Sequence, residues 1–100
     1  MRIVSRKALR EFWERPDHRD SEVPLRAWFK TVEKSDWATP ADIKAQFRSA
    51  SFLANNRVVF NIAGNKYRLI VWVSYPARVI LIRFVGSHPE YDALSDPSRI

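Results

Sequence analysis

The sequence contains no cysteine. This absence excludes disulfide bridges, thiolate zinc sites and a nucleophilic thiol, so any chemistry must use other side chains. Long apolar runs are also missing, because the longest, Leu69 to Val73, is far shorter than the roughly 20 residues of a bilayer-spanning helix. Basic residues open the sequence, and no hydrophobic signal segment follows them. We therefore expect a cytoplasmic protein that does not bind membranes.

Internal repeats, low-complexity segments and long linkers are absent too. One hundred residues can form a single compact core but leave no room for a second one, so we expect one domain over residues 1–100. No cluster of carboxylates has the pattern of a metal site. We therefore expect neither a metal nor a cofactor.

Charge and hydrophobicity indicate a folded, basic protein. Lysine and arginine number 17 against 11 aspartate and glutamate residues, which gives a formal net charge of +6. Such an excess favours a polyanionic partner, namely nucleic acid, the ribosome or an acidic protein, although a basic surface can also serve solubility alone. Hydrophobic residues make up 46% of the sequence, which is enough for a core without metals or disulfides.

The first half of the sequence predicts a short strand over residues 2–5 and three helices. Ser5 is the expected cap of the first helix, which runs through residue 15 and ends at a proline. Ser21 is expected to cap the second helix, which extends to about residue 34. Thr39 is expected to cap a short third helix, with Pro40 at its first position.

The second half is rich in β-branched and aromatic residues and predicts a three-stranded antiparallel meander. The expected strands are Arg57 to Ile62, Lys66 to Val73 and Arg78 to Val85. Helices therefore come first and strands last. This order is typical of an α+β fold in which N-terminal helices pack on one face of a small antiparallel sheet.

The turns of this meander predict which side chains meet across the sheet. A two-residue turn at positions 64 and 65 places Asn61 opposite Arg68. An even-length loop centred between residues 75 and 76 then places Arg68 opposite Arg83, whereas an odd-length loop would send Arg83 to the other face. Lys66 lies two residues before Arg68 and is expected on the same face.

Two arginines that face each other on neighbouring strands repel, so an anion is expected between them. A phosphate fits this position, because a planar guanidinium donates two parallel hydrogen bonds to its oxygens. The alternative is that these arginines pair with acidic residues of the same chain or lie solvated on an open sheet face.

A histidine and a tyrosine follow the last expected strand, within reach of the arginine row. Histidine can accept or donate a proton near pH 7, and Tyr91 could donate a hydrogen bond or share in proton transfer. His88 is therefore a candidate for acid–base chemistry. The alternative is an ordinary surface histidine.

Two blocks of the sequence resemble the signature blocks of the HigB toxin family. They are VVFNIAGNKYRL (Val58 to Leu69) and IRFVGSHPEYD (Ile82 to Asp92), and the opening RIVSRKALREFWE and the middle stretch WATPADIKAQFRSASF are similar to that family as well. The resemblance implies a RelE-like fold and a ribosome-dependent mRNA endoribonuclease, an mRNA interferase. It also implies a HigA-type antitoxin with a helix-turn-helix domain, through which alone the toxin would reach DNA.

The expected reaction is metal-independent cleavage in which the ribose 2'-hydroxyl attacks the adjacent phosphorus. It needs a proton acceptor, positive charge at the phosphorane and a proton donor for the leaving oxygen. The expected catalytic residues are Arg68, Arg83, His88 and Tyr91. The expected substrate-binding residues are Lys66 and Asn61. The arginines would stabilise the phosphorane, His88 would transfer protons, and Tyr91 would share that role or stack on a base.

Two other classes of function compete with this hypothesis. A non-catalytic RNA- or ribosome-binding module would have the same basic charge but would need no proton-transfer residue. A DNA-binding regulator is a third possibility, yet none of the expected helices has a convincing helix-turn-helix spacing.

Overall fold

The computed structural model describes residues 1–100 and has an α+β architecture built on one mixed sheet. The strand order is β1-β5-β4-β3-β2, and every neighbouring pair is antiparallel except β1 with β5. The strands are β1 (Arg2–Val4), β2 (Ser51–Leu53), β3 (Arg57–Ile62), β4 (Tyr67–Ser74) and β5 (Val79–Ser87). The expected α+β class is confirmed. The sheet is mixed and not antiparallel as expected, because the expected opening strand, β1, pairs in parallel with β5 at one edge of the meander, while β2 extends the other edge.

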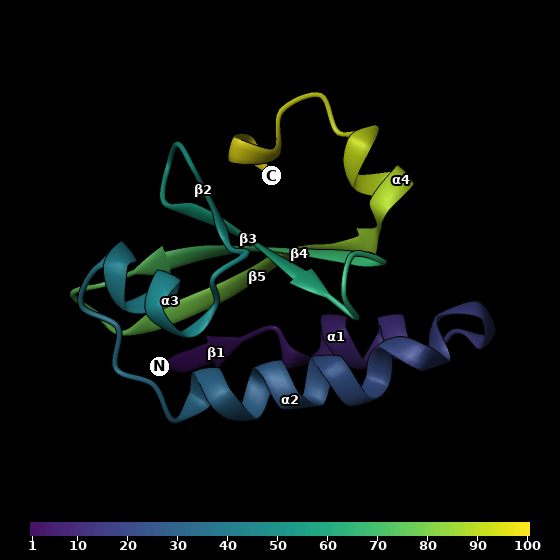
Figure 1. Ribbon diagram of the computed structural model, residues 1–100, viewed down its shortest axis with the longest axis horizontal. Helices are drawn as coiled ribbons and strands as arrows, with labels where there is room; N and C mark the ends of the chain where they lie inside the picture. Colours follow the sequence, from purple (N-terminus) through teal and green to yellow (C-terminus); the bar gives the residue numbers. More distant parts are fainter.

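Helices cover both faces of this sheet (Figure 1). They are α1 (Arg6–Trp13), the 3₁₀ helix η1 (Pro16–Ser21), α2 (Glu22–Glu33), α3 (Pro40–Gln46), α4 (His88–Asp92) and the 3₁₀ helix η2 (Pro97–Arg99). As expected, α1 and α2 lie together beneath one face. The opposite face is not open, because α4 and the segment that ends at Ile100 lie over it. None of the helices combines the length and apolarity that a bilayer crossing would need.

Of the three expected helix caps, only one is confirmed. Thr39 and Asp42 form a capping box at the start of α3, with the Asp42 carboxylate accepting the Thr39 N–H at 3.1 Å. Ser5 is wrong as a side-chain cap, because it has φ of 76° and makes no cap hydrogen bond. Ser21 is wrong as well, because η1 leads directly into α2 and the Ser21 hydroxyl donates to the His18 carbonyl at 2.6 Å.

The main core lies between the helices α1 and α2 and the lower face of the sheet. It is a cluster of 19 buried hydrophobic residues that includes Leu9 of α1, Leu25 of α2 and Leu69 of β4, all with no exposed surface. A second, smaller apolar layer lies on the upper face, where Val59 and Ile70 are 3% and 0% exposed but do not belong to the main cluster. The alternation along β3 and β4 therefore buries apolar side chains on both faces of the sheet.

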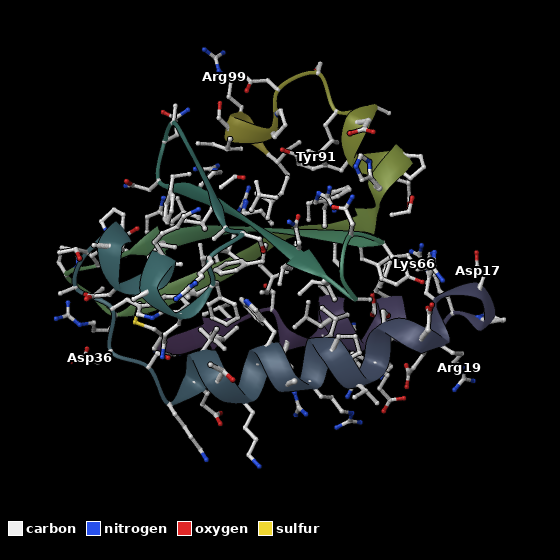
Figure 2. All side chains as sticks on the ribbon, viewed as in Figure 1. Asp17, Arg19, Asp36, Lys66, Tyr91 and Arg99 are labelled. Carbon is white, nitrogen blue, oxygen red and sulfur yellow. The ribbon has the colours of Figure 1, made fainter.

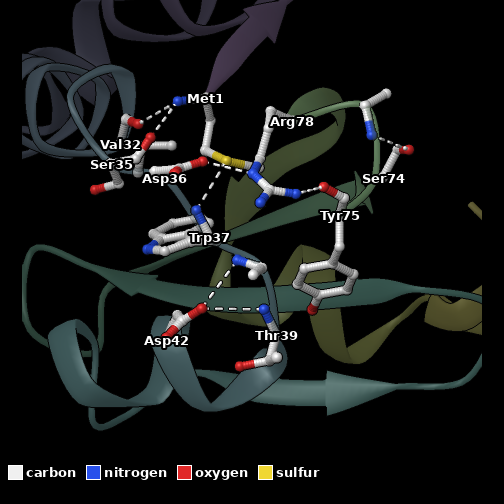
Figure 3. Close-up of polar contacts among 12 residues, drawn as sticks. Met1, Val32, Ser35, Asp36, Trp37, Thr39, Asp42, Ser74, Tyr75 and Arg78 are labelled. Atoms are coloured by element: carbon white, nitrogen blue, oxygen red, sulfur yellow. Dashed lines mark hydrogen bonds and ion pairs between the residues drawn. The ribbon is translucent and has the colours of Figure 1, made fainter.

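The loop between α2 and α3 is fastened to the sheet by polar contacts (Figure 3). The Trp37 N–H donates to the Met1 sulfur at 3.2 Å, and Asp36 pairs with the Arg78 guanidinium at 2.5 Å. Arg78 has a left-handed φ of 56°, and its N–H donates to the Tyr75 carbonyl at 3.3 Å. Arg78 therefore closes the turn between β4 and β5. The sequence had predicted that Arg78 begins the strand, and this prediction is wrong.

Candidate active site

One of the expected cross-strand pairs is present as predicted. Asn61 lies directly opposite Arg68, because Ile62 pairs with Tyr67 across a turn centred on residues 64 and 65. Gly64 in this turn has φ of +69°, a conformation that side chains disfavour and glycine adopts freely. The sequence therefore placed the β3–β4 register correctly.

The expected pairing of Arg68 with Arg83 is wrong. Because Arg78 belongs to the turn, Ser74 pairs with Val79. Val73 therefore faces Ile80, two residues beyond the Arg78 that the expected register placed there. A β-bulge then lies opposite Ile70 and Val71, and Arg83 is its extra residue. Arg68 consequently faces Gly86. The Arg83 side chain is exposed, and its Nε donates to the main-chain oxygen of Ile100 at 3.0 Å.

Lys66 does not join Arg68 either. It precedes β4 in the turn, so strand alternation does not fix its direction, and its ammonium pairs with Asp20 of η1. The Tyr67 hydroxyl donates to the same carboxylate at 2.5 Å. Figure 2 shows Lys66 at the end of the sheet near the η1 residues Asp17 and Arg19, whereas Tyr91 lies on the upper side. Lys66 therefore pairs with an acidic residue of the same chain and does not extend the row formed by Asn61 and Arg68.

The Asp20 cluster predicts an asymmetric pair of stability changes. Tyr67 is only 1% exposed, so Asp20→Ala leaves its hydroxyl buried without an acceptor. Tyr67→Phe leaves a half-exposed carboxylate that still pairs with Lys66. We expect Asp20→Ala to lower the urea midpoint more than Tyr67→Phe, and the double variant to be more stable than Asp20→Ala alone. Equal midpoints for the two single variants would contradict this assignment.

The same cluster predicts how stability depends on pH. The hydrogen bonds from Lys66 and then Tyr67 lower the pKa of the Asp20 carboxyl below its usual value. A group with a lowered pKa in the folded state stabilises fully above its ordinary pKa and loses that contribution as the pH falls through the lowered value. The difference in urea midpoint between the wild type and Asp20→Asn should therefore be constant at neutral pH and shrink below about pH 4.

Arg68 is a charged side chain held in a nearly buried position, with 9% of its surface exposed. Asn65 fixes the guanidinium from the preceding turn: its side-chain oxygen accepts from Nη2 at 2.7 Å, and its carbonyl accepts from Nη1 at 3.1 Å. On its other side, the Arg68 Cζ lies 5.9 Å from the ring centre of Tyr91 in α4. No carboxylate pairs with Arg68. Its charge is therefore oriented but not neutralised.

The short helix α4 is positioned by a capping box and a strand contact. The Ser87 hydroxyl accepts the Glu90 N–H at 3.3 Å, and the Glu90 carboxylate accepts the Ser87 N–H at 2.9 Å. The Ser87 N–H holds the pKa of the Glu90 carboxyl below its usual value. The His88 N–H donates to the Lys66 carbonyl at 3.0 Å, so α4 is joined to the turn that carries Asn65.

Within α4, His88 pairs with an aspartate that the sequence analysis did not single out. The His88 Nδ1 lies 2.8 Å from the Asp92 carboxylate, and the two side chains are 39% and 58% exposed. Their i, i+4 spacing in one helix was the signal that could have indicated the pair. The contact on Nδ1 orients the ring and leaves Nε2 as the nitrogen that can exchange a proton with a ligand. His88 is thus a partly exposed histidine with one acidic partner, and its role in proton transfer stays a prediction.

The candidate site therefore combines an unneutralised guanidinium with a partly buried tyrosine of α4, the helix that also carries the His88–Asp92 pair. Asn61 lies opposite Arg68 on β3. The molecule's most prominent cleft is elsewhere, between α1 and α2 beneath the sheet, and is lined by residues such as Trp13 and Phe29. Positive charge next to a proton-transferring group is what cleavage at a phosphodiester requires.

We expect Asp92 to act as a positioning residue for His88 in the expected mRNA cleavage. Asp92→Asn keeps the shape of the side chain but removes the negative charge that contacts Nδ1 of His88. We expect the cleavage rate constant to fall roughly 10- to 100-fold with little change in KM, the size of loss found when the carboxylate partner of a metal-bound histidine is removed. Asp92→Glu should recover part of the loss. In a His88→Ala background Asp92→Asn should have no further effect, and additive losses would contradict the coupling.

The chain is α+β, its helices α1 and α2 lie below the sheet, and the basic side chain of Arg68 lies above it. This is the fold of a RelE-like toxin. The family model for HigB toxin, described as the RelE-like toxic component of a toxin-antitoxin system, matches residues 21–94. The chain therefore belongs to the HigB toxin family.

Curated relatives agree with this family. The mRNA interferase toxin HigB of Escherichia coli (strain K12) is 32% identical over 92% of this chain and 88% of its own length. The mRNA interferase HigB of Shigella flexneri has the same identity and coverage. That of Escherichia coli O6:H1 is 22% identical over 95% of this chain and 92% of its own length.

Proposed function

We propose that this chain is an mRNA interferase that cuts messenger RNA on the ribosome and is neutralised by a HigA-type antitoxin. The observation that carries the proposal is the contact of the Arg68 guanidinium with Tyr91 of α4, the helix that also carries the His88–Asp92 pair. The names of the relatives, mRNA interferase, agree with it. We place the protein in the cytoplasm, where its substrate is.

The proposed reaction is attack of the ribose 2'-hydroxyl on the adjacent phosphorus. The 2'-oxygen forms a bond to phosphorus, the bond to the 5'-oxygen breaks, and the 2'-proton leaves while a proton is added to the departing oxygen. The products are a 2',3'-cyclic phosphate and a free 5'-hydroxyl. Water can open the ring to a 3'-phosphate. No metal is needed where side chains supply both the charge and the proton transfer.

Each side chain has a distinct role in this proposal. Arg68 stabilises the extra negative charge of the phosphorane, for which Asn65 holds its guanidinium in a fixed direction. His88 transfers protons through Nε2, with Asp92 holding Nδ1. Tyr91 stacks on a base or donates a hydrogen bond, and Asn61 orients the ribose. Lys66 has no direct role, because Asp20 neutralises it.

The test is to incubate the protein with translating ribosomes and to map new RNA 5'-ends. We expect new ends within translated codons for the wild type and none for His88→Ala. A non-catalytic RNA- or ribosome-binding module would produce no new ends with either protein, and that result would overturn the proposal. New ends on naked RNA at the same rate would overturn ribosome dependence alone.

The antitoxin is tested separately by co-expression with the partner encoded beside the toxin. A net charge of +6 favours an acidic segment in that partner. We expect a stable complex that blocks cleavage and binds operator DNA, while the toxin alone gives no gel shift. Specific DNA binding by the toxin alone would contradict the proposal.

A further inference from the structure

The segment after α4 crosses the upper face of the sheet and ends on two arginines from different strands. The main-chain oxygen of Ile100 accepts from the Arg57 Nη2 at 2.7 Å and from the Arg83 Nε at 3.0 Å. Asn55 adds a third contact, because its side-chain N–H donates to the Ser98 carbonyl at 3.2 Å. One oxygen thus lies between guanidinium groups of β3 and β5, above the strand between them.

The two arginines have more positive charge and more donors than this oxygen satisfies. Neither Arg57 nor Arg83 forms an ion pair with any carboxylate side chain of the chain. The Nε of Arg57 is buried and has no acceptor. Converging guanidinium groups are stabilised best by an anion with several oxygens, because each fork can then donate two hydrogen bonds. The main-chain oxygen of Ile100 therefore occupies a position suited to a phosphate.

This position lies on the same face as the candidate active site. Arg68 and Trp72 are four residues apart in β4 and so share a face, and Trp72 pairs with Arg57. Four residues of strand span about 13 Å, so Arg57 lies that far along the sheet from Arg68, whereas Arg83 lies level with Ile70 and Val71, two to three residues from Arg68. Arg57 and Arg83 would thus contact a different phosphate from the one that is cleaved.

The segment that covers the pair is weakly attached. Its only regular structure is η2, a three-residue 3₁₀ turn with no buried residue. Asp96 caps this turn by accepting from the Ser98 N–H at 3.1 Å and the Ser98 hydroxyl at 2.6 Å. These hydrogen bonds hold the pKa of the Asp96 carboxyl below its usual value. A few surface hydrogen bonds therefore keep the segment closed over the pair.

We propose that Arg57 and Arg83 form a second phosphate-binding site for the RNA backbone, and that residues 96–100 occupy it in the free chain and compete with RNA. The inference rests on the proposed function for the identity of the ligand. It assigns Arg83 to binding of an RNA phosphate other than the one that is cleaved. Residues 96–100 then compete with that phosphate for the same two arginines. RNA affinity is then reduced by the fraction of molecules in which the segment is closed.

The test measures binding of a short RNA with 2'-O-methyl groups, which cannot be cleaved, by fluorescence anisotropy at fixed salt. Two releasing substitutions, Asp96→Ala and Pro97→Gly, are combined in the full chain to disrupt η2. We expect this variant to bind roughly three- to tenfold more tightly than the wild type. Arg83→Gln and Arg57→Gln should each bind roughly tenfold more weakly.

Arg48→Gln is the matched control, because Arg48 is exposed in the turn between α3 and β2 and its substitution removes the same charge. Arg48→Gln should weaken RNA binding less than Arg83→Gln does. Because the Arg83 side chain is also exposed, its substitution should not unfold the protein. In the Arg57→Gln/Arg83→Gln background the releasing substitutions should no longer tighten binding. Equal effects of Arg48→Gln and Arg83→Gln, or wild-type affinity of the released variant, would overturn the proposal.

The outcome is distinguishable from failure of the proposed function. Binding of uncleavable RNA requires neither the ribosome nor His88. If the released variant binds RNA more tightly but no new 5'-ends form on ribosomes, the phosphate site stands and the nuclease assignment is overturned. If ends form but the affinities of these variants equal those of the wild type and the control, only the second site is overturned.

Discussion

His88→Ala is expected to lower the rate of mRNA cleavage on translating ribosomes by roughly 100- to 10,000-fold, the usual contribution of a general acid or base. His88 Nδ1 is held by Asp92 at 2.8 Å, which leaves Nε2 for proton exchange, and Tyr91 of the same helix contacts Arg68. Growth arrest after expression of the toxin should be lost with cleavage. The measurement is primer extension on a translated message over a time course.

The other histidine of the sequence provides the control for this variant. His18 lies on η1 and stacks on Phe12 with ring centres 4.1 Å apart, beneath the sheet. His18→Gln should lower the urea midpoint but leave the cleavage rate of the folded protein unchanged. His88→Ala should do the reverse, because the His88 side chain is 39% exposed. A His88→Ala rate within threefold of the wild type, a threshold far below the expected loss, would exclude His88 from the reaction.

Arg68→Lys has the second large expected effect, a loss of about 100- to 1,000-fold in cleavage rate, comparable with removal of one oriented donor to a developing oxyanion. Lysine keeps the positive charge but cannot donate from a planar fork. It also cannot reproduce the two contacts by which Asn65 orients the guanidinium. Single-turnover cleavage of ribosome-bound mRNA is the measurement.

Asn65→Ala separates orientation of Arg68 from its charge. Asn65 lies in the turn before β4, and its side-chain oxygen contacts Nη2 of Arg68 at 2.7 Å. This variant retains the guanidinium and should lose less rate than Arg68→Lys. An unchanged fold is checked by the urea midpoint. If Arg68→Lys cleaved at the wild-type rate, the phosphorane would have to be stabilised by another group, and the proposed centre would be wrong.

The sequence predicted the local parts of this fold because they depend on neighbouring residues. Thr39, Pro40 and Asp42 encode the start of α3 by capping chemistry alone, and the structure has the capping box there. The turn at Gly64 likewise needs only a residue that accepts positive φ, so the pairing of Asn61 with Arg68 was predicted correctly.

Contacts between distant segments were not predictable in the same way. Arg78 closes the β4–β5 turn while it pairs with Asp36, more than 40 residues earlier, and this changes the register of β5. Lys66 is directed to Asp20 for the same reason, since no local pattern relates a lysine before a strand to a 3₁₀ helix 46 residues away. Ser21 lost its capping role because η1 runs into α2 without a break.

By itself, the sequence determined an α+β chain with a basic surface and a histidine and a tyrosine after its last strand, because hydrophobic period, charge and turn chemistry are properties of short segments. Only the tertiary structure decided which cations remain available to a ligand. Asp20 neutralises Lys66, a bulge carries Arg83 away from Arg68, and the Ile100 oxygen joins Arg83 to Arg57. The physical reason is that electrostatic pairing depends on distance in space, which the chain sets only when its remote segments pack together.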